Sequence, residues 1–318
     1  MNDTLYLDAT APLLQPHDLG RRLPDLRRGG IDAALTTAAS IEEFTDAMTV
    51  IGQWLEIERS RRHPVRIGRS VAALRAAKAE GDIGIVLHFQ GADPIGDQLD
   101  RLNLFHASGL RVMQLTYNAR NRLGDGCFEE SDAGLSKFGR AALARMEALG
   151  IAVDLSHAGQ RTALQVTEAA TRPLVVTHAN ARALFDTPRN LPDDLIRQVA
   201  ASGGVIGVCA APFFLTRGRP ATRDMLIDHI AYIAALVGVA HVGVGFDFAE
   251  EDADDYVYYG YDERYIPKPP WIWPSGIAGH AEAGGMAAAL LAHGFDDGEI
   301  TDILGENFLR VFARLWGG

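Results

Sequence analysis

Short apolar runs recur along the chain and alternate with longer segments that have the hydrophobic period of a helix. The runs occupy residues 5–8, 31–36, 83–89, 110–117, 151–157, 174–178, 204–210 and 241–247. Most of them are continuously apolar, a pattern typical of parallel strands that are covered on both faces. We therefore expect eight buried, parallel strands.

Helical patterns fill the intervals between these runs. Residues 40–60 begin with Ser40 and place Glu43 three positions later, which predicts a capping box. Residues 134–150 end in Gly150, a residue suited to closing a helix, and residues 223–238 carry an apolar stripe at helical spacing. Repeated strand–helix alternation predicts a single (β/α)8 TIM barrel over residues 1–318. The alternative, an open doubly wound sheet, usually carries a glycine-rich phosphate loop, and neither GxGxxG nor GxxxxGKS/T occurs.

Residues 249–276 depart from this rhythm. The segment is acidic, contains prolines and carries seven Tyr or Trp side chains: Tyr256, Tyr258, Tyr259, Tyr261, Tyr265, Trp271 and Trp273. A connection of this length predicts a functional loop or an interface. Aromatic faces beside carboxylates suit organic cations, whereas an aromatic-rich surface also suits the interface of a homodimer. Both interpretations stay open.

Composition narrows the class of protein. A net charge of −11 argues against nucleic acid or an anionic membrane as a partner. The two cysteines, Cys127 and Cys209, lack CxxC spacing, which argues against a disulfide framework and a zinc knuckle. No apolar run approaches the roughly 20 residues of a membrane span, and the first residues do not resemble a signal peptide. We therefore expect a cytoplasmic protein.

Polar side chains stand where the predicted strands end, which is where (β/α)8 barrels place their active sites. Neutral imidazoles are common zinc ligands, and two of them with an aspartate can leave a position open for water. Alternatively, the aspartate can move protons beside the metal. A lone histidine at a strand end is more often structural, and His17, His63, His106, His229, His241, His280 and His293 are interpreted as structural or exposed. The candidates at the strand ends are Asp8, Gln90, Tyr117, Asn118, His157, His178 and Asp247.

Several stretches resemble the membrane dipeptidase (renal dipeptidase) family of metallopeptidases, within the amidohydrolase-like barrel superfamily. They are DLSHAGQRTALQV, VVTHANARALFDTPRNLPDD, GGVIGV, HVGVGFDF and DILGENFLRVF, and the similarity runs from about Ile83 to Phe312. The resemblance implies that His157 and His178 hold the second of two zinc ions. It also implies that Arg189 grips a substrate carboxylate and that Asp247 handles protons.

The chain departs from the family pattern where the first zinc would bind. The family's D-G-H-x-D motif at the first strand reads Asp8-Ala9-Thr10-Ala11-Pro12, so its His and Asp ligands are missing. The bridging glutamate becomes Gln90, a neutral and weaker ligand. The substrate-polarising histidine becomes Tyr117, whose hydroxyl can hydrogen-bond an oxyanion, and the tyrosine expected after the seventh strand aligns with Ala211. The resemblance therefore implies one zinc ion, or another divalent metal, instead of two.

These residues predict a dipeptidase-like hydrolase that cleaves an amide-type bond in a small carboxylate-bearing substrate. In this hypothesis His157, His178 and Gln90 bind the metal, Asp247 and Tyr117 are catalytic, and Asn118 and Arg189 contact the substrate. Cys127 and Asp8 are further candidates, and Cys127 lies close to Glu129 and Glu130 in a distinctive loop over residues 121–139. Two alternatives stay open: a lyase or isomerase on the same barrel, and an inactive binding homologue.

Overall fold

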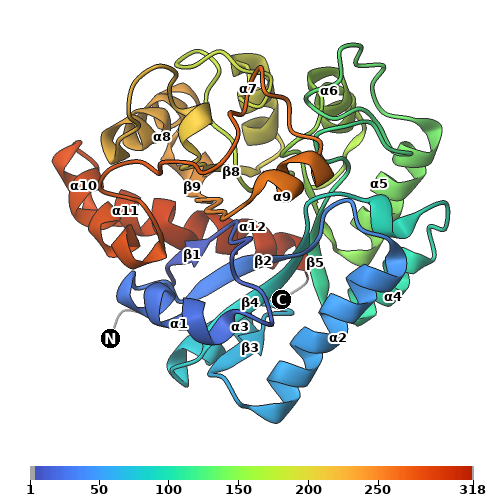
Figure 1. Ribbon diagram of the computed structural model, residues 1–318, viewed down its shortest axis with the longest axis horizontal. Helices are drawn as coiled ribbons and strands as arrows, with labels where there is room; N and C mark the ends of the chain where they lie inside the picture. The colour runs from blue at the N-terminus through green and yellow to red at the C-terminus, as the bar shows by residue number, and fades with distance from the viewer. Residues whose placement is uncertain (1–3, 317–318) are drawn as a thin grey trace.

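The computed structural model describes residues 4–316, whose strands form one parallel sheet that curves into a barrel ringed by helices (Figure 1). The barrel order is β1-β2-β4-β5-β6-β7-β8-β9, and β3 pairs with β4 outside this path. The strands are β1 (Leu7–Asp8), β2 (Ala33–Ala39), β3 (Val65–Ile67), β4 (Ile83–Phe89), β5 (Leu110–Gln114), β6 (Ala152–Asp154), β7 (Val175–Val176), β8 (Val205–Val208) and β9 (Val242–Val244). The predicted (β/α)8 barrel is confirmed.

Helices connect the strands and cover the outside of the barrel. The α-helices are α1 (Leu19–Arg28), α2 (Phe44–Ser60), α3 (Val71–Ala79), α4 (Arg101–Ala107), α5 (Lys137–Leu149), α6 (Gln160–Ala169), α7 (Asp193–Ala201), α8 (Arg223–Val237), α9 (Ala253–Tyr258), α10 (Met286–Ala292), α11 (Asp297–Thr301) and α12 (Asn307–Trp316). Five short turns of other helical types are η1 (Asp93–Ile95), η2 (Pro212–Phe214), η3 (Val239–His241), η4 (His280–Gly285) and η5 (Asp302–Glu306). In the described part of the chain, no helix has the length and apolarity needed to cross a membrane.

Two sequence-based expectations about local structure are wrong. Strand β3 was not expected, because its sequence VRI is too short and too polar to stand out as an apolar run. The capping box at Ser40 and Glu43 does not form, because α2 begins at Phe44 and Glu43 is its uncapped N-cap residue. Gly150, by contrast, closes α5 in the left-handed conformation at φ 80°, as expected.

The barrel closes between β9 and β1. The amide of Ala9 donates to Val244 O at 3.1 Å, and the amide of Asp247 donates to Thr10 O at 3.0 Å. The buried carboxylate of Asp8 reinforces this seam, because its Oδ1 accepts from the amides of Thr10 (3.1 Å) and Phe246 (2.9 Å). These contacts fix the end of β9, and with it Asp247, against the end of β1.

His280 is the partner of the other carboxylate oxygen of Asp8, Oδ2. The imidazole Nε2 lies 2.8 Å from Asp8 Oδ2, and both side chains are buried. Asp8 was a candidate for the active site, but its oxygens are engaged by the backbone and by His280. The structure therefore gives Asp8 a role in closing the barrel.

Replacing Asp8 with alanine tests this role. Two buried N–H donors and one imidazole would lose their acceptor, so we expect the free energy of unfolding to fall by about 3 kcal/mol or more. Urea unfolding followed by circular dichroism measures the change. Asp97→Ala, at an exposed position, is the control and should leave stability within about 0.5 kcal/mol of the wild type. An Asp8→Ala variant as stable as this control would contradict the role.

Candidate active site

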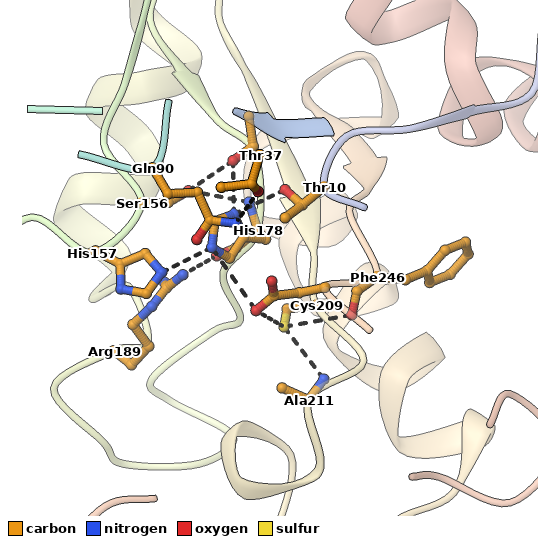
Figure 2. A network of polar contacts seen from close by, with 12 residues as sticks. Thr10, Thr37, Gln90, Ser156, His157, His178, Arg189, Cys209, Ala211 and Phe246 are labelled. Carbon is orange, nitrogen blue, oxygen red and sulfur yellow. Dashed lines mark hydrogen bonds and ion pairs between the residues drawn. The ribbon is translucent and has the colours of Figure 1, made fainter. Parts of the chain in front are cut away.

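The two histidines from the predicted strand ends meet above β6 and β7 (Figure 2). His157 Nε2 lies 3.0 Å from His178 Nε2, and Asp247 Oδ2 lies 3.9 Å from His178 Nε2. His178 and Asp247, which follow His157 by twenty-one and ninety positions, therefore lie in one cluster with it. Parallel strands bring their carboxyl ends to the same rim of the barrel, which is why residues so far apart in the sequence meet.

The backbone at two of these positions is strained. His157 has φ 63° and Asp247 has φ 59°, and Arg61 is the only other non-glycine residue with positive φ among residues 4–316. L-residues rarely occupy this region, and the cost is of order 1–3 kcal/mol at each position. The fold holds both side chains in place against this cost, which supports a functional rather than a structural role for them.

Hydrogen bonds assign the tautomer of His178. Its Nδ1 lies 2.9 Å from Thr10 Oγ1 and 2.7 Å from Thr177 Oγ1. Each hydroxyl has one proton, and each already donates it: Thr10 to Ala9 O at 2.6 Å and Thr177 to Asp154 Oδ2 at 2.5 Å. Both hydroxyls can therefore only accept from His178, which must carry its proton on Nδ1 and keep a lone pair on Nε2.

His157 has the same tautomer for an analogous reason. The Nδ2 of Asn118 donates to Tyr259 O at 3.3 Å, which turns Oδ1 toward His157 Nδ1 at 2.8 Å. An amide oxygen only accepts, so His157 donates from Nδ1 and its Nε2 also keeps a lone pair. Two lone pairs then face one another at 3.0 Å, an arrangement that a cation between or beside them would stabilise.

Asp154 organises the polar layer beneath the histidines. Its fully buried carboxylate accepts from the amide (2.9 Å) and hydroxyl (2.8 Å) of Ser156 and from the amide of Thr177 (3.0 Å). It also accepts from Gln114 Nε2 at 3.1 Å, and His88 Nε2 lies 3.2 Å away. Burial by itself would raise the pKa of Asp154, but His88 and the Thr177 hydroxyl outweigh it and hold the pKa well below its ordinary range.

Burial dominates the electrostatics of the cluster. It lowers the pKa of His157 and of His178 well below 6.5, and the nearby cation of Arg189 lowers both further. Burial also raises the pKa of Asp247 to about 8, an effect that Arg189 opposes and Glu251 reinforces. Neutral imidazoles are the form that binds metals, and a carboxyl with this pKa can exchange protons near neutral pH.

Arg189 brings a buried positive charge next to the histidines (Figure 2). Its Nη2 donates to His178 O at 2.7 Å, and its Cζ lies 5.4 Å from the centre of the Phe214 ring. Its Nε has no hydrogen-bond partner, and no carboxylate of residues 4–316 forms an ion pair with it. A buried cation without a protein counter-ion favours the arrival of an anion.

A cavity of about 450 Å³ opens beside the cluster, and its lining includes Gln90, Tyr117, His157 and Asp247. The Tyr117 ring stacks on His157 with a centroid distance of 4.3 Å. Tyr261 donates its hydroxyl proton to Glu251 Oε1 at 2.8 Å, so Tyr117 must donate to Tyr261 across 3.0 Å. The hydroxyl of Tyr117 is thus oriented by the segment that follows β9.

The other predicted site residues have protein partners. Gln90 Nε2 donates to Thr37 Oγ1 at 2.8 Å, and Asn118 is engaged with His157, as described above. Cys127 lies 4.0 Å from Asn118 Oδ1, and burial raises the pKa of its thiol to about 12, which disfavours the thiolate that a nucleophile or ligand needs. Both cysteines are free, as expected.

Three residues in and around the cluster were missed by the sequence analysis as functional candidates. Thr177 directly precedes His178, and Asp154 lies three positions before His157. The role of each depends on contacts between neighbouring strands, which the sequence does not show. Cys209 lies with Sγ 3.9 Å from Asp247 Oδ2. Its place in the apolar run over residues 204–210 was the only signal in the sequence, and that signal does not distinguish it from a core residue.

The two imidazoles are placed to supply the nitrogen ligands of a metal ion. The Nε2 lone pairs of His157 and His178 converge, and Gln90 and Asp247 line the adjoining cavity with oxygen donors. Within residues 4–316, however, no three His, Cys, Asp or Glu side chains gather into a metal-binding cluster. Thr10, which the sequence resemblance aligns with a metal ligand of the family, accepts a hydrogen bond from His178.

The tautomers give a spectroscopic prediction. With histidine labelled by nitrogen-15, the metal-free protein should show His157 and His178 neutral and protonated on Nδ1 at pH values well below 6.5. Because the folded pKa values are lowered, these groups stabilise the fold above pH 6.5, and this contribution is lost as the pH falls below that value. His157→Ala and His178→Ala assign the two signals. Protonation on Nε2 in either ring would contradict the assignment.

The sequence profile of the membrane dipeptidase family, peptidase family M19, matches residues 18–259. An uncharacterized dipeptidase of Schizosaccharomyces pombe is 30% identical over 234 residues, which are 72% of this chain and 53% of the relative. The chain therefore spans about half the length of this curated relative.

Solved structures show the same similarity over nearly the whole chain. An amidohydrolase from Pseudomonas aeruginosa is 30% identical, with a TM-score of 0.91 and coverage of 99% of this chain and 98% of the other. A metallopeptidase from Rhodobacter sphaeroides, solved with a phosphinate mimic of the dipeptide L-Ala-D-Ala, is 25% identical. Its TM-score is 0.84, with coverage of 98% of this chain and 100% of the other. The chain therefore belongs to the membrane dipeptidase family, peptidase family M19, and is a metallohydrolase of that family.

Proposed function

We propose that the protein hydrolyses an amide-type bond in a small, carboxylate-bearing molecule with the help of one divalent metal ion, zinc. The convergence of two Nε2 lone pairs at 3.0 Å carries this proposal. His157 and His178 would hold the ion, with Gln90 and Asp247 as further oxygen donors from the cavity wall. When bound, zinc supplies a Lewis acid and lowers the pKa of water.

Asp247 would transfer the proton. It lines the cavity, and its Oδ2 lies 3.9 Å from His178 Nε2, where a carboxylate can accept a proton from water and return it. In the forward reaction its Oδ2 takes a proton from the attacking water and delivers it to the leaving amine.

Arg189 and Tyr117 would bind the substrate and the transition state. Arg189 is the buried cation without a protein counter-ion, so it suits a substrate carboxylate. Tyr117 would stabilise the oxyanion, which requires its hydroxyl to turn from Tyr261 toward the substrate. Dipeptides are the first substrates to test, because the Rhodobacter sphaeroides relative was solved with a dipeptide mimic.

Metal analysis tests the role of the histidines. We expect about one zinc per chain in the wild type and a loss of metal, together with a fall in activity of at least 10²-fold, in His157→Ala and His178→Ala. His229→Ala, which removes a buried histidine elsewhere, controls for general destabilisation. A metal-free wild type, or full activity in both site variants, would rule out the proposal.

The Arg189→Met variant tests recognition of the carboxylate. Losing a buried charge partner should raise KM for a carboxylate substrate by at least about tenfold, with little change for the corresponding carboxamide. Steady-state kinetics on this pair of substrates measures the effect, and Arg219→Met on the surface is the control. Equal losses for both substrates would show that Arg189 has a structural role instead.

A second candidate is a lyase or isomerase reaction. It is favoured by the lack, in the described residues, of a group of three His, Cys, Asp or Glu side chains placed to hold a metal ion. Asp247 and Tyr117 would then move protons without hydrolysis. Products analysed by mass spectrometry distinguish the two reactions, because hydrolysis adds the mass of water. An inert protein that still binds a ligand would instead identify a binding homologue.

The expectations about the compartment, the partners and the assembly of the protein also stand as proposals. The net charge of −11 supports a protein that acts on small molecules and binds neither nucleic acid nor membranes. A cytoplasmic location stays a proposal. An interface between two copies of the chain is the alternative role proposed for the aromatic segment over residues 249–276.

A further inference from the structure

The segment over residues 249–276 forms one wall of the cavity. It contributes Glu251, Tyr259, Tyr261, Trp271 and Trp273 to the lining. These rings pack inward: Tyr261 contacts Tyr117 and Trp271, and Trp273 contacts Phe248, at centroid distances of 5.1–6.4 Å. Tyr258, by contrast, is 54% exposed. Most of these aromatic side chains therefore face the cavity or the barrel rather than a surface available to a second copy.

The cavity has an excess of negative charge. Asp18 and Glu250 pair with Arg21 and Arg22 at its rim at 2.7–3.1 Å, which neutralises this group of four side chains. The remaining acids in the lining are Glu42, Asp247, Glu251 and Asp255, and none of them forms an ion pair with a Lys or Arg of residues 4–316. A ligand that enters meets uncompensated carboxylates beside aromatic rings.

Glu251 is the least satisfied of these acids. Its Oε1 accepts from Tyr261 at 2.8 Å, whereas its Oε2 is buried and has no hydrogen-bond partner. The pKa of Glu251 is raised to about 7, chiefly by burial, which the hydrogen bond from Tyr261 opposes and the charges of Asp255 and Asp252 reinforce. A buried carboxylate oxygen without a donor costs free energy, and an N–H donor from a ligand would recover it.

We propose that Glu251, with the faces of Tyr261 and Trp271, forms a subsite for an ammonium or guanidinium group on the substrate. The cation would donate to Glu251 Oε2 and lie against the aromatic faces. This inference rests on the proposed function, in which Arg189 holds a carboxylate. The substrate is therefore a zwitterion whose cationic group lies toward the cavity wall formed by the 249–276 segment.

Binding experiments test the subsite without any turnover. Isothermal titration on the zinc-loaded full-length chain would compare ω-amino carboxylic acids of increasing chain length with the unsubstituted carboxylic acids of the same length. At the best length, the wild type should prefer the amino acid by about tenfold. Glu251→Gln should abolish this preference, since the amide keeps an acceptor for Tyr261 but carries no charge.

Glu250→Gln is the matched control, because Glu250 is an adjacent acid of the same cavity that is already paired with Arg21 and Arg22. It should keep the preference. No preference at any length in the wild type, or a preference that survives Glu251→Gln in a folded protein, would overturn the inference. So would an equal loss in Glu250→Gln, which would assign the effect to the net charge of the cavity.

The outcomes separate this inference from the proposed function. If the protein binds ω-amino acids through Glu251 but hydrolyses no amide, the cation subsite stands and the proposed function fails. If it hydrolyses dipeptides with uncharged side chains and shows no preference for the ω-ammonium group, the proposed function stands and the subsite fails.

Discussion

One fully buried carboxylate, Asp154, orders the loops on which the two histidines stand. It accepts the amides and hydroxyls that follow β6 and β7, so the two strand ends are tied to a single charged group. The hydroxyl of Thr177, committed to Asp154, can only accept from His178, and this fixes where the imidazole keeps its lone pair. A charge that the barrel interior could not otherwise tolerate is thereby stabilised, and it sets the chemistry of the ring above it.

Two residues from other strands support the histidine pair. Thr10, which follows β1, accepts from His178 at 2.9 Å. Tyr117, which follows β5, stacks on His157 with a centroid distance of 4.3 Å. The resemblance drawn from the sequence aligns both positions with histidines of the family, so the residues that depart from the family pattern are in contact with the two histidines that follow it.

Two charged side chains are incompletely paired, one beside the histidines and one in the cavity wall. Arg189 is a buried cation beside the histidines with no anion of the protein to pair with it, whereas Glu251 is a half-satisfied carboxylate in the wall that follows β9. Two hydroxyl hydrogen bonds join Glu251 to Tyr261 and Tyr261 to Tyr117, and the Tyr117 ring stacks on His157. The wall that follows β9 is thus in contact with the histidine pair through Tyr117.

The sequence by itself determined the barrel and the residues at its rim. Continuously apolar runs that alternate with helical segments are typical of parallel strands covered on both faces, and three of these runs end at His157, His178 and Asp247, which such a barrel brings to the same rim. It did not determine β3, the start of α2, or the use of Asp8, because these depend on pairing and capping partners far along the chain. The tautomers, the raised pKa of Asp247 and the unsatisfied oxygen of Glu251 were decided by the tertiary structure alone. Each is set by burial and by neighbours from other strands, and a linear pattern of apolar and polar positions contains neither.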